Sequence, residues 1–217
     1  MKFYVVEKME IKYYHKNYWI GYWDKYTILS RKDIAYTTSY KEAVRISKEQ
    51  AKSVKIKAMA KYQNKKTTTQ EYKNFISKYK DCYGKLDQIT VTYGKGGQYK
   101  SIFTITKVDF SSEKKQDYIW AVNFKTIKKE KTIENVNWDF SPRKSDCLEA
   151  LKAEKNYFLT NNSINHYEYY KTILLDDIVE EDEKVIIPTE NETIIYEVVR
   201  INLPKLLNKY KAKKQTV

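Results

Sequence analysis

The sequence predicts an α+β protein in two parts: a small antiparallel sheet with two helices at the N-terminus, and a β-rich module with one good helix after it. Three observations lead to this fold class. Segment 39–62 repeats apolar residues at spacings of three and four, short runs of aromatic and β-branched residues alternate with turn residues, and a glycine-rich turn joins two such runs. We expect a basic module at 1–84 and a β-rich α+β module at 85–217.

The helix predicted at 39–62 is the longest periodic segment of the chain. Ser39 or Thr38 can cap it, with Glu42 at capping-box distance. Its apolar stripe consists of Tyr40, Ala43, Val44, Ser47, Ala51, Val54, Ala58 and Tyr62. A second stripe is basic and consists of Lys41, Arg45, Lys48, Lys52 and Lys55. We expect Glu42 and Glu49 to lie beside this basic stripe without neutralising it.

Short strands and a second helix complete the predicted N-terminal module. Strands are expected at 3–6, 18–23, 26–29 and 34–37, because aromatic and β-branched residues are dense there. The second helix is expected from Gln70 to Cys82, since its aromatic and apolar residues have helical spacing and Gly84 can end it.

The C-terminal module is predicted to be mainly strands. Gly94 to Gly97 favours a hairpin between strands 89–93 and 99–108, because three glycines permit positive φ. Ser141 and Pro142 predict the start of a helix that ends near Asn161. The remaining expected elements are strands at 118–124, 132–140, 185–187 and 193–201, an ambiguous segment at 164–175, an acidic loop at 176–183 and a short basic helix or tail at 203–214.

The charge of the chain is strongly asymmetric. The net charge is +13, from 41 basic and 28 acidic residues, and residues 1–80 alone carry 19 basic and 7 acidic side chains. An AT-rich genome would explain the abundance of lysine equally well, but it does not explain this asymmetry. Because four of the 41 cations are arginine, contact with a nucleic-acid backbone is favoured over base-specific recognition.

Aromatic residues are interleaved with lysines near the N-terminus. Alternating rings and cations suit stacking on unpaired bases, although some rings must form the core of the small sheet and tyrosine is also common in protein interfaces. The expected nucleic-acid interface is a set of basic and aromatic residues: Lys12, Lys16, Tyr18, Trp19, Lys41, Arg45, Lys48, Lys52, Lys55, Lys65 and Lys66.

The sequence offers little for catalysis or for a cofactor. His15 and His166 have no nucleophile or carboxylate at a meaningful spacing, and we expect no metal and no cofactor. A metal-dependent nuclease would need clustered carboxylates and a lysine, which Asp182-Glu183-Lys184 provides only superficially. We therefore expect a protein that is not an enzyme.

Cysteine usage and hydropathy favour a cytoplasmic protein. Cys82 and Cys147 form no disulfide framework, so reduced and buried thiols are expected. The first ten residues lack the apolar run of a signal peptide, and we expect no membrane-spanning segment.

A family resemblance covers residues 3–60. The tyrosine-rich opening, the run YWDKYTI and the run from Ala35 to Ala43 that leads into the helix resemble the start of uncharacterised accessory proteins of phages and mobile elements with AT-rich genomes. The resemblance implies accessory roles, including inhibition of host defence nucleoproteins such as CRISPR effectors.

Together these features predict a non-catalytic basic protein that binds nucleic acid or a nucleoprotein complex, with anti-CRISPR-like inhibition of host defence as one role. The alternatives are an interaction module for an acidic protein partner and a metal-dependent nuclease.

Overall fold

The computed structural model describes residues 1–16, 23–62, 67–73, 86–110, 117–161, 178–189 and 191–212. The chain forms two compact units. The first unit is Lys2–Asp109, and the second unit is Phe110–Val217 together with Met1. Each unit contains its own antiparallel strands and its own helical cover.

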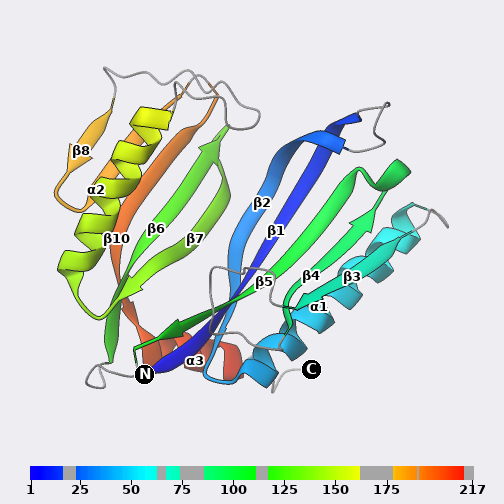
Figure 1. Ribbon diagram of the computed structural model, residues 1–217, viewed down its shortest axis with the longest axis horizontal. Helices are drawn as coiled ribbons and strands as arrows, with labels where there is room; N and C mark the ends of the chain where they lie inside the picture. The colour runs from blue at the N-terminus through cyan, green and yellow to red at the C-terminus, as the bar shows by residue number, and fades with distance from the viewer. Residues whose placement is uncertain are drawn as a thin grey trace. The chain divides into compact units, whose positions relative to one another are not determined.

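Five strands form the sheet of the first unit, in the order β3-β4-β5-β1-β2 (Figure 1). They are β1 (Lys2–Lys16), β2 (Trp23–Thr37), β3 (Thr68–Lys73), β4 (Leu86–Tyr93) and β5 (Tyr99–Asp109). All four neighbouring pairs are antiparallel. The turn between β4 and β5 contains the 3-10 helix η1 (Lys95–Gly97).

Helix α1 (Tyr40–Lys61) covers one face of this sheet. Its capping was predicted correctly, since the Ser39 side chain accepts a hydrogen bond from the Glu42 amide at 3.3 Å. Below the helix, Ala51 packs with Ile89, Val91 and Phe103 in a cluster whose members are at most 4% exposed. Small residues on the buried stripe allow α1 to lie close to the sheet.

The second unit also has five strands, in the order β7-β6-β10-β9-β8. They are β6 (Tyr118–Lys128), β7 (Lys131–Ser141), β8 (Val179–Glu181), β9 (Lys184–Pro188) and β10 (Thr193–Asn202). Helix α2 (Lys144–Asn161) packs against β6, β7, β9 and β10, and α3 (Leu203–Ala212) follows β10 (Figure 1).

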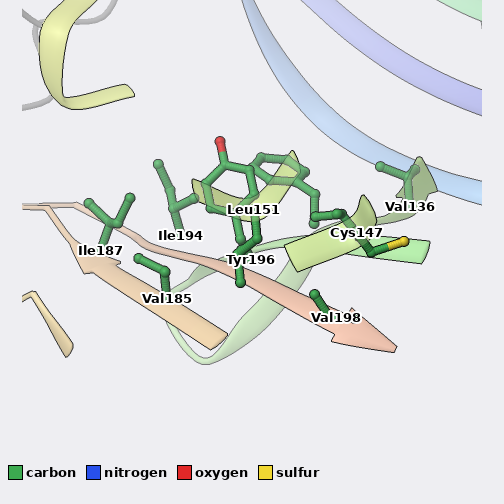
Figure 2. Close-up of a cluster of buried hydrophobic side chains, with 10 residues drawn as sticks. Val136, Cys147, Leu151, Val185, Ile187, Ile194, Tyr196 and Val198 are labelled. Carbon is green, nitrogen blue, oxygen red and sulfur yellow. The ribbon is translucent and has the colours of Figure 1, made fainter. Parts of the chain in front are cut away.

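A single hydrophobic cluster joins α2 to its sheet. Cys147 and Leu151 on α2 face the strands, where Tyr196 packs between aliphatic side chains (Figure 2). The ring of Phe124 lies 5.1 Å from Trp138 and 5.2 Å from Tyr196, measured between centroids. The described part of the acidic run that was expected as a loop at 176–183 forms β8 and a turn at Asp182 and Glu183.

The predicted fold class is wrong, because the described residues form ten strands and three α-helices in place of a small sheet with two helices and a β-rich module. The expected small sheet with two helices is instead a sheet with two 15-residue strands and one long helix among the described residues. Thr68–Lys73, where the second helix was expected to begin, is strand β3, and residues 74–85 lie outside the described part. Pairing with β4 makes the described start of the expected helix, including Tyr72, a strand.

Strand β1 was predicted too short because charged residues interrupt its apolar pattern. Lys8, Glu10 and Lys12 alternate with apolar residues, so they lie on one face while Met9 and Ile11 lie on the other. Register shifts within the β1–β2 pair allow the two long strands to remain paired.

The hairpin between β6 and β7 contains a strained turn that can be improved. Lys128 pairs with Lys131, so Lys129 and Glu130 form a two-residue loop, and their φ values are 48° and 63°. Loops of this kind favour Asn-Gly, because most side chains disfavour positive φ. We expect K129N/E130G to raise the free energy of unfolding by about 1 kcal/mol in urea denaturation. The control variant Lys131→Gly should lower the free energy of unfolding instead, because the φ of Lys131 is not positive. Equal effects of the two variants on stability would contradict this interpretation.

The thiol of Cys147 should be unreactive in the folded protein. Burial, together with the charges of Asp139 and Asp146, raises the pKa of Cys147 to about 11, and its Sγ donates to the Asp139 carbonyl at 3.2 Å. The thiolate is the reactive form, so alkylation of a Cys82→Ser variant should be slow and should accelerate about tenfold per pH unit below pH 11. The denatured variant should react fast. Equal alkylation rates of the native and the denatured variant would refute the assignment of Cys147 as an unreactive thiol.

Candidate nucleic-acid interface

The entire net charge of the protein resides in the first unit. Lys2–Asp109 contains 23 basic and 10 acidic residues, whereas the rest of the chain contains 18 of each. A surplus of +13 on one unit produces a positive field that attracts polyanions. The cations of this unit are therefore the first candidates for a binding surface.

The outward face of α1 displays the predicted basic stripe, but part of that stripe is neutralised. Arg45 donates to Glu42 at 2.8 and 2.9 Å and also pairs with Glu49 one turn later. Lys48 lies 3.4 Å from Glu71 on β3. The expectation that Glu42 and Glu49 would leave the stripe uncompensated is therefore wrong at Arg45, because Glu49 lies at the i+4 position from it.

Three lysines of the stripe differ from Arg45 and Lys48. Lys41, Lys52 and Lys55 form no ion pair with any residue that the structure describes. Lys41 and Lys52 are exposed and Lys55 is partly exposed. Flexible ammonium groups of this kind suit contact with phosphate oxygens without reading sequence.

Two apolar side chains lie on the same exposed face. Ile56 is 58% exposed and Met59 is 49% exposed, and with Lys52 and Lys55 they occupy helical positions i, i+3, i+4 and i+7. Large exposed apolar groups beside cations are unusual on a helix that serves only as a solvated cover. The C-terminal half of α1 therefore offers both charge and apolar surface.

A cluster of tyrosines follows directly at the C-terminal end of α1. We call Tyr62, Tyr93 and Tyr99 the tyrosine cluster. The rings of Tyr93 and Tyr99, which are cross-strand partners on β4 and β5, stack at 5.5 Å and 11°. Tyr62 caps α1 and lies 6.0 Å from Tyr93 and 5.9 Å from Tyr99. All three side chains are partly exposed.

Lys12 is brought to this cluster by strand pairing. Lys12 is the partner of Tyr99 in the β1–β5 register, and its Nζ lies 5.9 Å from the centre of the Tyr99 ring. The centre of the ring of the next residue, Tyr13, lies 4.8 Å from Lys100 Nζ and 5.6 Å from the centre of the Tyr26 ring. Lys12, one of the predicted interface residues, therefore lies beside the tyrosine cluster.

A carboxylate lies on the same face of β1 as Lys12. Glu10 is bound by Lys8 at 2.7 Å and by the Ser30 hydroxyl at 2.9 Å. Burial of Glu10 acts to raise its pKa, but these hydrogen bonds and the nearby lysine charges outweigh burial and hold the pKa below its ordinary value. Burial, reinforced by the charge of Glu10, raises the pKa of the Tyr93 phenol, so that ring stays neutral.

Several predicted interface residues cannot be placed. Tyr18, Trp19, Lys65 and Lys66 lie outside the described residues, and only the backbone of Lys16 is described. The sequence prediction did not include the tyrosine cluster, Ile56 or Met59. The glycine-rich turn was the available signal for the cluster, because it places the aromatic residues on either side of it opposite one another.

The second unit has a cavity of different character. It measures about 810 Å³ and lies between α2 and the β8–β9 hairpin. At this cavity Lys144 pairs with Glu183 and Lys155 pairs with Glu180, and its lining also includes Lys152, Glu181 and Asp182. Among the described residues, no group of three or more His, Cys, Asp or Glu side chains could hold a metal ion. Within that same part of the chain, no helix is long and apolar enough to cross a membrane.

The tyrosine cluster depends on Gly94. Gly94 has φ 81° and ψ −178°, which is a region that glycine alone populates, and a Cβ there would lie 2.6 Å from Cδ2 of Tyr99. We expect Gly94→Ala to displace the Tyr99 ring and to lower the free energy of unfolding by about 1 to 3 kcal/mol in urea. Gly96→Asn is the control, because asparagine tolerates the φ of 64° there. Equal stability of Gly94→Ala and the wild type would contradict this role.

Comparisons with known proteins found no relative of this chain. No protein-family model matches the chain, and neither the curated proteins nor the solved structures include a match. The function must therefore be inferred from the chemistry of the surface, in which unpaired lysines, exposed apolar side chains and tyrosine rings lie together on the unit that carries the net charge.

Proposed function

We propose that the protein is a non-catalytic binding protein whose first unit engages the backbone of a nucleic acid, either free or within a nucleoprotein complex. The observation that supports this most directly is the charge of the first unit, +13, together with three lysines on α1 that have no acidic partner among the described residues. Phosphate contacts by lysine provide affinity that does not depend on sequence.

The arginines of the first unit fit backbone binding better than base reading. Arg31 binds Glu7 at 2.7 and 3.2 Å, and Arg45 binds Glu42 and Glu49. Both guanidinium groups are thus bound to carboxylates of the protein. The planar group that would recognise guanine in a duplex is already engaged in these pairs. Lysine is therefore the cation that is available for contact with phosphate.

In the cell, the same proposal gives the protein an accessory role in the cytosol, where it would occupy a nucleic acid or a defence nucleoprotein and block it stoichiometrically. The support for this setting is the resemblance of residues 3–60 to phage-borne accessory proteins and the small number of cysteines. A stoichiometric inhibitor needs a surface and no catalytic centre, which agrees with a binding face made of lysines and rings.

The lysines of α1 can be tested with a charge-matched control. We expect K41Q/K52Q/K55Q to weaken binding to a labelled oligonucleotide and to reduce the slope of log Kobs against log salt by about 2 to 3, because up to three phosphate contacts are lost. The measurement is fluorescence anisotropy of the full chain at several salt concentrations.

The control variant K131Q/K152Q/K205Q removes the same charge from exposed lysines of the second unit. It should keep the wild-type slope and affinity within about twofold. Equal losses of affinity in the two triple variants would mean that binding depends on net charge alone and that α1 has no specific role in it. The absence of any binding by the wild-type chain would overturn the proposal and favour an acidic protein as the partner.

A further inference from the structure

We propose that the nucleic acid bound by the first unit is single-stranded, and that the tyrosine cluster accepts its unpaired bases while the lysines of α1 hold its backbone. This inference rests on the proposed function and specifies the class of ligand. Three independent features support it: the geometry of the rings, the cations beside them and the exposed apolar residues of α1.

The tyrosine cluster is a preformed aromatic surface. Tyr93 and Tyr99 are cross-strand partners with near-parallel rings, and Tyr62 lies close to both of them at the end of α1. None of the three side chains is fully buried, so ring surface remains for a ligand. Rings that are already held in place lose little conformational entropy when a base stacks on them, and stacking tolerates any base sequence.

Two lysines lie next to these rings, in positions to contact the phosphates of a strand whose bases stack on the rings. Lys12 Nζ lies 5.9 Å from the Tyr99 centroid, and Lys61 Nζ lies 5.5 Å from the Tyr62 centroid. Neither lysine forms an ion pair with a residue that the structure describes. Aromatic faces next to free ammonium groups match the two parts of a single strand, which are bases with exposed faces and phosphates close to them.

The exposed apolar residues of α1 extend this surface toward the unpaired lysines. Met59 precedes Tyr62 by three positions, and Ile56 and Met59 lie beside Lys52 and Lys55 on the helix. A duplex turns its phosphates outward and stacks its bases inside, so it would leave Ile56 and Met59 in water. An unpaired strand exposes base and sugar surface that can cover them.

The test compares one sequence in two forms. A labelled oligonucleotide of about 20 nucleotides is titrated with the full chain by anisotropy, alone and annealed to its complement, at physiological salt. We expect the single strand to bind about tenfold more tightly than the duplex, because stacking adds to the phosphate contacts that both forms share.

Two variants isolate the rings and the apolar residues. Tyr62→Leu should weaken single-strand binding about fivefold or more and leave duplex binding unchanged, whereas Tyr62→Phe, which keeps the ring, should bind as the wild type does. The variant I56Q/M59Q changes only exposed side chains, so it should fold normally and should weaken the single strand selectively. It decides the question even if Tyr62→Leu fails to fold.

The outcomes separate this inference from the proposed function. Equal affinity for single strand and duplex, or equal losses for both forms in I56Q/M59Q, would overturn the single-strand inference. In that case the proposed function stands if K41Q/K52Q/K55Q still weakens both forms. Failure of the wild-type chain to bind either form would overturn both.

Discussion

Strand β1 is hydrogen-bonded on both of its edges, to β2 and to β5, and the arrangement of the first unit depends on this pairing. The register with β5 places Val6 opposite Ile105 in the core and Lys12 opposite Tyr99 at the far end of the strand. Because alternate residues point to opposite faces, one shift of register would exchange the faces of every β1 side chain. The same pairing that buries the core therefore also positions a cation against an aromatic ring.

Charge compensation divides the cations of the first unit into two groups. Arg31, Arg45 and Lys48 are bound to carboxylates, and such pairs at or near the surface contribute little to stability. They nevertheless cancel charge locally, so the positive field is concentrated on the lysines that lack such partners among the described residues. Some of these lysines, namely Lys12, Lys52 and Lys55, lie near the aromatic or apolar groups described above.

Much of the second unit and the whole of α1 could be predicted from sequence, whereas the long strands of the first unit could not. Ser39 as a cap, the spacing of Ala43, Ala51 and Ala58, and the glycine-rich turn are local signals, and the structure confirms each. The charged residues of β1 and the segment Thr68–Lys73 required knowledge of their strand partners. The candidate site was only partly predictable for the same reason: the lysines of α1 belong to one segment, but Tyr62, Tyr99 and Lys12 come together through pairing between distant segments.

The hairpin of β4 and β5 has a consequence for the synthesis of the protein. It supplies two of the three rings in the tyrosine cluster, while Tyr62 and Lys12 come from earlier in the chain. A nascent chain that has emerged only as far as the end of α1 would display the lysines of that helix without the rings beside them. The combined surface is complete only once residue 109 has left the ribosome and β5 has paired with β1. The lysines of α1 are thus synthesised before Tyr93 and Tyr99, and the combined surface requires both segments.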